Sequence, residues 1–260
     1  EPSMPKLAYG LNFNTEKLTR LLSDNATING VGIVRARLKS AQLNAENGRI
    51  ESLLLEDGTS LSADLFIDCS GEAALLIGEA LEVEFVDWSQ LLPASRAIAV
   101  TAKTDHNSIP VHHCTATDDG WFLSTPLQHR TACQFRYSPE HVSDEVAATH
   151  VERFVGELGP EALALSNLRS GHRQHKWRNN CVALGAAAGW VEPLDISIFH
   201  FLMSGLSRLT ALLPTLAMQD RLATLFNREM TEQLACVRDF ALLHYHSAQW
   251  RDTPFWNAAR

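Results

Sequence analysis

The sequence has little that points to a membrane or to export. No apolar run approaches the roughly 18 to 20 residues that a membrane-spanning helix needs. The first ten residues, EPSMPKLAYG, have neither the charged start nor the apolar core of a signal peptide. We therefore expect no membrane partner. Because methionine is absent from position 1, we interpret the chain as a fragment or a processed product.

Cysteine and histidine are present but do not form the spacings of a stapled or metal-bound fold. The five cysteines are scattered singly, are odd in number and form no CxxC pair, which favours reduced thiols in a cytoplasmic protein. His112 and His113 are adjacent, so they point to opposite faces of a strand. His244 and His246 lie two apart in a helical segment and do not face each other. We predict no metal site.

The chain also lacks an excess of basic residues. It has 22 Lys and Arg against 30 Asp and Glu, a formal net charge of -8, which argues against non-specific binding to nucleic acid. The one basic run, RSGHRQHKWR, is interpreted as a solvated strand and turn. No GxSxG elbow of a serine hydrolase occurs. A small molecule is the favoured partner.

The amino-terminal third predicts a helix, a meander and an α/β unit. Asn14 is a suitable cap for a helix that stops at Asn29-Gly30. Residues 31–64 are typical of three antiparallel strands, because Asn-Gly and Asp-Gly dipeptides separate them. Residues 65–67 predict a strand covered on both faces, and Ser70-Gly71 opens a helix through about Leu81.

The rest of the chain predicts a second sheet followed by helices. Residues 96–137 contain four β-compatible runs, and Ser143 begins a helix to about Leu158. A further strand is expected within 167–177 and a short buried strand at 181–184. From Pro193 onward the pattern is nearly all helical, with the last long segment ending near Trp250.

The segment LGAAAGWVEPLDISIFHF carries the strongest chemical signal. Gly185 and Gly189 let a backbone approach a flat or phosphorylated ligand closely. Pro193 suits the first turn of a helix, and the unpaired amides of such a turn bind anions. The alternative is a tightly packed strand-to-helix junction in which Asp195 is favoured by the helix dipole.

This segment resembles the flavin-dependent tryptophan halogenase family, whose comparable stretch reads approximately GxAAGFxEPLESTxIH. Four further stretches agree with that family in order along the chain: ADLFIDCSGEAALLIGEAL, VDWSQLLPASRAIAV, DGWFLSTPLQHRT and the tail RDTPFWNAAR. The resemblance therefore spans almost the whole sequence.

The resemblance implies an oxidoreductase that uses reduced FAD, oxygen and chloride or bromide to make hypohalous acid. The oxidant would halogenate an indole, such as tryptophan, or another aromatic substrate in a separate pocket. A flavin reductase would supply the reduced FAD, and a homodimer is expected. In the family's Pro-Leu-Glu-Ser-Thr segment, the working glutamate falls on Asp195 of this sequence.

The resemblance also assigns the remaining site residues. The halide would meet the backbone amides of Ser197 and Ile198. The positions that would line the flavin are Gly185, Ala188, Gly189 and Pro193. Trp121 and Pro126 match the family's Gly-Trp-x-Trp-x-Ile-Pro motif, and some members carry a histidine at His200, which is otherwise an ordinary helix residue.

Two alternatives stay open. In the tryptophan motif, Leu123 and Thr125 replace Trp and Ile, which permits a flavin monooxygenase of the same fold. Ile196 and Ile198 replace smaller or polar residues, and Asp195 is one methylene shorter than Glu. A catalytically silent binding or scaffold protein of the halogenase fold is the second alternative.

We predict an α+β chain of α/β origin: part of a glutathione-reductase-like FAD-binding fold with an antiparallel substrate sheet and a helical carboxyl region. No GxGxxG turn, the usual seat of the FAD pyrophosphate, occurs. The chain is thus expected to be the carboxyl-side half of a longer protein. Its approximate regions are 1–90 and 180–213 on the flavin side, 91–179 on the substrate side and 214–260 as helices.

Overall fold

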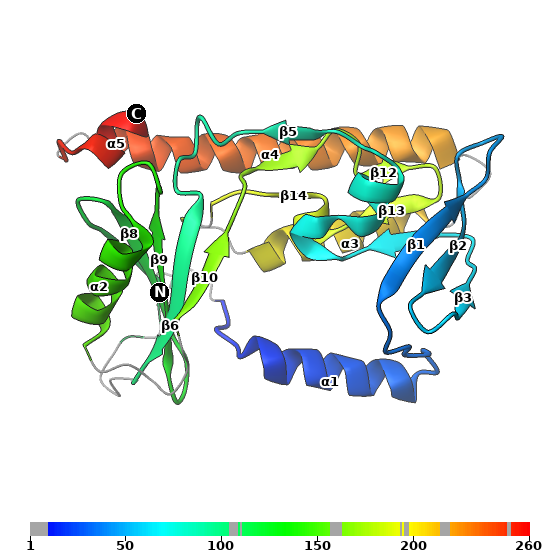
Figure 1. Ribbon diagram of the computed structural model, residues 1–260, viewed down its shortest axis with the longest axis horizontal. Helices are drawn as coiled ribbons and strands as arrows, with labels where there is room; N and C mark the ends of the chain where they lie inside the picture. Colours follow the sequence, from blue (N-terminus) through cyan, green and yellow to red (C-terminus); the bar gives the residue numbers. More distant parts are fainter. Residues whose placement is uncertain are drawn as a thin grey trace, which may run out of the picture.

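The chain combines short sheets with three carboxyl-terminal helices, as Figure 1 shows. The computed structural model describes residues 10–103, 109, 111–156, 163–192, 194, 198–213, 219–248 and 251–260. Within these ranges, no helix combines the length and the apolar character required to cross a membrane. The mixture of helices and mainly antiparallel strands agrees with the predicted α+β class.

The predicted amino-terminal helix and meander are confirmed. Helix α1 covers Thr15–Ile28, and the Asn14 side chain accepts a hydrogen bond from the Lys17 amide at 3.1 Å. None of its residues is buried, and Figure 1 shows it along the lower edge of the molecule, opposite α4. The meander begins later than expected, and its antiparallel strands are β1 (Leu38–Leu43), β2 (Ile50–Leu55) and β3 (Ser60–Leu61).

The predicted α/β unit is present with an irregular helix. Strand β4 (Phe66–Asp68) pairs in parallel with β13 (Cys181–Ala183), which pairs with β12 (Trp177–Arg178). The expected coverage of both faces of β4 is wrong, because Ile67 is 46% exposed. After β4 come a 3-10 turn, η1 (Gly71–Ala73), and a π-helix, η2 (Leu75–Ala80).

Asp68 explains where η2 starts. Its carboxylate Oδ2 accepts hydrogen bonds from the backbone amides of Leu76 at 2.9 Å and Ile77 at 2.8 Å. The same carboxylate accepts the Ser70 amide through Oδ1 at 2.9 Å. A buried acceptor at the end of a strand thus satisfies the unpaired donors at the beginning of the next helix.

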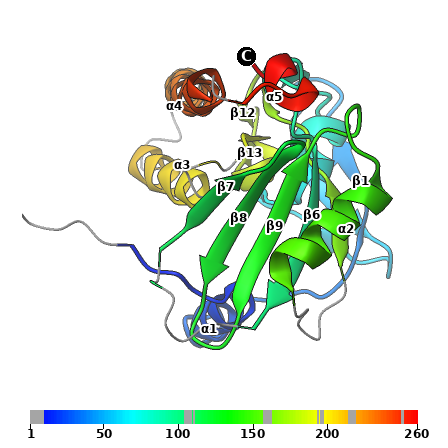
Figure 2. The same cartoon turned by 90° about the vertical axis from the view of Figure 1, so that its left-hand side faces the viewer.

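The predicted second antiparallel set forms a five-stranded sheet in the order β10-β6-β9-β8-β7. Its strands are β10 (Ala164–Asn167), β6 (Arg96–Ala102), β9 (Thr131–Tyr137), β8 (Gly120–Pro126) and β7 (His113–Ala116). Helix α2 (Asp144–Val155), capped by Ser143, covers one face, and Figure 2 shows α3 and α4 toward the other.

One expected strand is instead three short ones. The stretch predicted within 167–177 divides among the end of β10, β11 (Gly171–Arg173) and the start of β12. Strand β11 joins β5 (Phe85–Asp87) and β14 (Gly189–Trp190) in a separate three-stranded sheet. A 3-10 turn, η3 (Gly185–Ala187), connects β13 to β14.

The helical carboxyl region is confirmed. It contains α3 (Ile198–Leu212), α4 (Gln219–Ser247) and α5 (Pro254–Ala258), and α4 runs along the long axis of the molecule in Figure 1. The predicted end near Trp250 lies outside the described residues. One face of α4 is buried at spacings of three and four residues, by Leu234, Val237, Ala241 and Tyr245, with Ala248 just beyond its end.

A buried polar cluster fixes α4 to the short sheets. The Asn227 side chain accepts the amides of Lys176 at 2.7 Å and Trp177 at 2.8 Å. The fully buried Lys176 ammonium lies 2.5 Å from Thr231 Oγ1 and 2.9 Å from His172 Nδ1. Burial lowers the pKa of Lys176 to about 7. Helix α4 is therefore held by specific polar contacts as well as by its apolar face.

The start of β8 tolerates no side chain. A Cβ added at Gly120 would lie 2.0 Å from the backbone oxygen of Arg136 in the neighbouring strand β9. Gly120→Ala is expected to lower the free energy of unfolding by ~2 kcal/mol or more, because neither strand can move aside cheaply. Gly32→Ala, where an added Cβ meets no atom of the described residues within 4 Å, is the matched control. Urea unfolding curves that coincide for the two variants would contradict this explanation.

Candidate functional site

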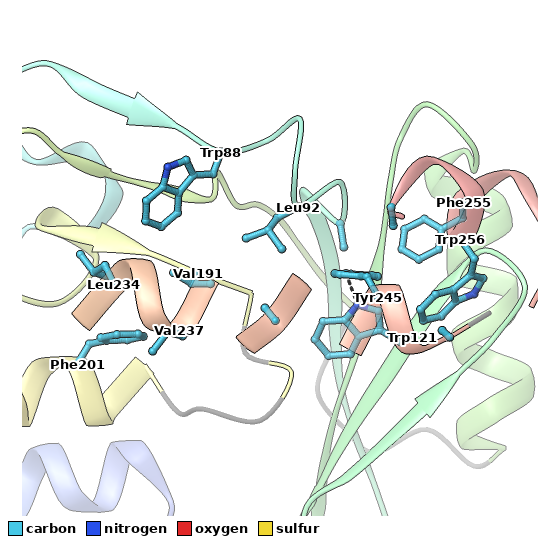
Figure 3. Close-up of a cluster of buried hydrophobic side chains, with 14 residues drawn as sticks. Trp88, Leu92, Trp121, Val191, Phe201, Leu234, Val237, Tyr245, Phe255 and Trp256 are labelled. Carbon is cyan, nitrogen blue, oxygen red and sulfur yellow. Dashed lines mark hydrogen bonds between the residues drawn. The ribbon is translucent and has the colours of Figure 1, made fainter. Parts of the chain in front are cut away.

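A pocket of about 360 Å³ lies where the five-stranded sheet meets α4 and α5, and we call it the aromatic pocket. Its lining is Cys114, Ala116, Trp121, Leu194, Phe240, Leu243, His244, Tyr245, Ser247, Ala248 and Trp256. Figure 3 shows Trp121, Tyr245 and Trp256 grouped at one end of the hydrophobic cluster. A lining of aromatic rings with small and aliphatic side chains between them suits a flat, apolar ligand.

The carboxyl-terminal tail holds one wall of this pocket. Trp256 Nε1 donates a hydrogen bond to the Thr117 carbonyl at 2.6 Å, and its ring lies 5.6 Å from that of Tyr245 between centroids. Arg251 binds the same hairpin, with Nη1 2.8 Å from Asp118 Oδ1 and Nη2 2.8 Å from the Ala116 carbonyl. The tail is therefore fastened to the turn between β7 and β8.

A buried hydrogen-bond chain begins at the pocket wall. Trp121 Nε1 donates to the Tyr245 hydroxyl at 3.0 Å, drawn as a dashed line in Figure 3. The Tyr245 hydroxyl donates to Glu192 Oε2, and Glu192 Oε1 accepts the Ala94 amide at 2.9 Å. Trp121, Tyr245 and Glu192 are each at most 2% exposed. The chain thus links β8, α4 and the segment after β14 without solvent.

The charges around this chain are strongly perturbed by burial. Burial raises the pKa of Glu192 to about 7, although hydrogen bonds and Arg136 favour its ionised form. Burial, followed by the neighbouring Glu192, raises the pKa of Tyr245 well above its usual value. The pKa of Arg136 falls to about 10, again mainly through burial, while attraction to Glu192 opposes the shift.

Arg136 supplies the positive charge on this face of the sheet. It stands opposite Trp121 in the register of β8 and β9, and its guanidinium carbon lies 4.9 Å from the centroid of the Trp190 ring. Nη2 donates to Gln134 Oε1 at 3.0 Å, whereas its buried Nε and Nη1 have no hydrogen-bond partner among the described residues. Arg136 therefore faces Glu192 as a partly unsatisfied cation.

Two predicted flavin positions lie inside the protein. A Cβ at Gly189 would come within 2.7 Å of His172 Cβ and 2.8 Å of the Gly171 carbonyl oxygen, so the pairing of β14 with β11 requires glycine there. Ala188 is 3% exposed and packs in the cluster around β4. Pro193 lies outside the described residues.

Gly185 differs, and its turn fits a cofactor edge. It follows β13 with φ of 61°, and Gly71 follows the parallel β4 with φ of 73°. Among the described residues, an added Cβ would meet nothing within 4 Å at Gly71, and at Gly185 only Leu202 Cδ1 at 3.8 Å. Ligands of such sheets sit beyond the carboxyl ends of parallel strands. The two neighbouring glycine turns, η1 and η3, therefore fit FAD at this edge.

Of the predicted halide and carboxylate site, the structure describes only the flanking residues. Asp195 and Ser197 lie outside the described residues, and Ile198 is the first residue of α3. Leu194, one residue before Asp195, lines the aromatic pocket, and its carbonyl accepts a hydrogen bond from the Cys114 thiol at 2.9 Å. The segment after Glu192 thus reaches the pocket at Leu194.

The remaining predicted residues are dispersed. Trp121 lines the aromatic pocket, whereas Pro126 lies at the far end of β8, where its carbonyl accepts Asn12 Nδ2 at 3.2 Å. His200 is exposed on α3, with Nε2 3.3 Å from Gln233 Nε2. Across the described part of the chain, no three His, Cys, Asp or Glu side chains are grouped to hold a metal ion.

Sequence reasoning missed Glu192, Tyr245 and Arg136. Glu192 stands between apolar residues in the quoted segment, and a carboxylate in such surroundings signals a buried partner. Tyr245 continues the buried spacing of α4 from Ala241, a periodicity that the sequence already displays. No local signal marks Arg136, because only the pairing of β9 with β8 brings it to Trp121.

Comparison with known proteins identifies the family. A family model described as tryptophan halogenase matches residues 1–260, so the chain belongs to the tryptophan halogenase family. The tryptophan 7-halogenase RebH of Lentzea aerocolonigenes is 32% identical over 258 residues, which cover 96% of this chain and 48% of RebH. The resemblance inferred from the motifs is thereby confirmed.

Solved structures agree on the fold. BrvH, a flavin-dependent halogenase from Brevundimonas sp. BAL3, is 33% identical with a TM-score of 0.89 over 95% of this chain and 51% of BrvH. The tryptophan 6-halogenase SttH of Streptomyces toxytricini is 28% identical with a TM-score of 0.91 over 95% of this chain and 49% of SttH. The chain therefore has the halogenase fold and spans about half the length of these relatives.

The buried Glu192 carboxyl makes stability depend on pH in a defined direction. Because its folded pKa of about 7 lies above the ordinary value of 4.5, the folded state holds a proton that the unfolded state has lost between these values. The free energy of unfolding should therefore fall as pH rises from about 4.5 to about 7, by on the order of 2–3 kcal/mol for this group.

Glu192→Gln removes the titrating group while keeping its shape. Urea unfolding at pH 5 and pH 7.5 should show a smaller loss of stability for this variant than for the wild type, whose other titrating groups are shared. Equal losses in the two proteins would place the pKa of Glu192 near its ordinary value.

Proposed function

We propose that the protein to which this chain belongs is a flavin-dependent halogenase that acts on an indole or a similar aromatic compound in the aromatic pocket. Asp195 is the carboxylate that orients the electrophile toward the substrate. The backbone amides of Ser197 and Ile198 bind chloride or bromide, an assignment that suits the beginning of a helix.

The aromatic pocket carries this proposal. Its walls bring Trp121 and Trp256 together with Leu194, one residue before the proposed carboxylate. An indole ring buries large apolar faces and gains further from neighbouring aromatic rings, so this lining favours it over a polar substrate. The identity to halogenases over nearly the whole chain supports the same reaction class.

The flavin is assigned to the other side of Trp121. The turns at Gly71 and Gly185 hold one edge of FAD, which when reduced supplies the electrons that let oxygen oxidise halide. A flavin reductase delivers the reduced FAD, and the reaction takes place in the cytoplasm. Trp121, 1% exposed, separates this side from the substrate and keeps bulk water out of the pocket.

The reaction is tested with the natural full-length polypeptide, reduced FAD, chloride or bromide, and a panel of indoles. Product masses should show replacement of one ring hydrogen by halogen. A hydroxylated product without a halogenated one would establish the monooxygenase instead. Absence of any product together with absence of bound flavin would establish a silent member of the family.

Substitution of Asp195 tests its assignment. Asp195→Asn removes the charge and should lower kcat about a hundredfold or more, because the electrophile loses its orienting group. Asp195→Glu keeps the charge and restores the length found in the resembling family, so kcat should stay within about tenfold of the wild type. Single-turnover rates under saturating halide measure both. Similar kcat values for Asp195→Asn and the wild type would contradict the assignment.

A further inference from the structure

The hydrogen-bond chain from Ala94 to Trp121 has only one possible direction when Glu192 is ionised. A carboxylate only accepts, so the Ala94 amide and the Tyr245 hydroxyl must both donate to it. The Tyr245 oxygen is then left with lone pairs, one of which accepts the indole N–H of Trp121 at 3.0 Å. The Tyr245 hydroxyl that accepts the Trp121 indole N–H is therefore itself oriented by Glu192.

Glu192 lies behind the pocket wall, not in it. Trp121 and Tyr245 line the aromatic pocket, whereas Glu192 does not. Glu192 is 2% exposed and Tyr245 is fully buried, so no bulk water competes for these contacts. The Glu192 side chain reaches the pocket through Tyr245 and Trp121, while its backbone carbonyl accepts the amide of Leu194, another lining residue, at 2.9 Å.

Charged and titratable groups surround Glu192 on two elements. Tyr245 faces it from α4, and Arg136 faces it from β9, where Arg136 also attracts Glu72 of η1. Arg136 and Trp121 are opposite each other in the register of β9 and β8. Arg136, which favours the ionised form of Glu192, therefore lies on β9, the strand next to the one that carries Trp121.

We propose that Glu192 is a positioning residue for the aromatic substrate: through the Tyr245 hydroxyl it fixes the indole ring of Trp121 as a wall of the aromatic pocket. The inference rests on the proposed function for the identity of the guest. Glu192, three residues before Asp195, thereby helps to set the shape of the aromatic pocket. The affinity for an aromatic compound that contacts the Trp121 ring then depends on whether residue 192 offers Tyr245 a hydrogen-bond acceptor.

The test measures binding of indole to the full-length polypeptide by titration calorimetry, in the absence of flavin and halide and at pH 8, where Glu192 with its pKa of about 7 is mostly ionised. Glu192→Gln keeps the shape, but its amide group has one acceptor for two donors, so the direction of the chain is lost. We expect indole binding to weaken about tenfold. Tyr245→Phe, which breaks the chain at its centre, should weaken binding at least as much, and the double variant should be no weaker than Tyr245→Phe alone.

Tyr137→Phe is the matched control. Tyr137 is also fully buried and donates its hydroxyl to Asp144 at 2.7 Å, but on the face of the same sheet that α2 covers. Its loss should leave indole binding unchanged. Wild-type binding in Glu192→Gln, or equal weakening in Tyr137→Phe, would overturn the proposal.

A spectroscopic readout separates positioning from general loosening. The ¹⁵N–¹H resonance of the Trp121 indole, identified by its absence in Trp121→Phe, should shift in Glu192→Gln and stay in place in Tyr137→Phe. An unchanged resonance in Glu192→Gln would also overturn the proposal. Because neither readout needs turnover, failure to halogenate in the product assay bears on the proposed function alone.

Discussion

The buried carboxylate of Glu192 needs hydrogen-bond donors, and this requirement holds α4, the five-stranded sheet and the segment after β14 together. Glu192 is 2% exposed, and a carboxyl group in such a place costs free energy unless its oxygens are paired. Its partners come from three separate parts of the chain: the Ala94 amide before β6, the Tyr245 hydroxyl on α4 and the field of Arg136 on β9. Satisfying one side chain therefore fixes a helix, a sheet and the segment after β14 relative to one another.

The pocket is a consequence of that arrangement. Helix α4 reaches along the molecule from the short sheets, where Asn227 holds it, to the five-stranded sheet, where Tyr245 accepts the Trp121 indole N–H. Beyond α4 the tail returns to the turn between β7 and β8, and Trp256 closes the space between them. The aromatic wall is thus built from residues more than a hundred positions apart, held by hydrogen bonds at their rims.

Local sequence patterns predicted most helices and strands. The residues that they did not predict are those whose roles depend on contacts between distant parts of the chain. The cap at Asn14, the hairpin glycines and the alternation in 96–137 act within a few residues, so α1, the meander and the larger sheet followed from the sequence. The motifs gave the family and pointed to Trp121. The roles of Glu192 and Arg136 depend on contacts across β8, β9 and α4, and no periodicity encodes them. Gly189 illustrates the same limit, because the pairing of β14 with β11 leaves no room for a side chain there, and its place beside the flavin stays a prediction.

A crystal structure of the full-length polypeptide with a bound indole tests most directly whether the aromatic pocket is the substrate site. We expect electron density for the ring between Trp121 and Trp256, with the contact from Tyr245 to Glu192 retained. A second pocket of about 370 Å³, whose lining includes Gln90, Asp239 and Arg260, offers a more polar alternative. Density for the ring in that pocket, with the aromatic pocket unfilled, would contradict the assignment of the aromatic pocket as the substrate site.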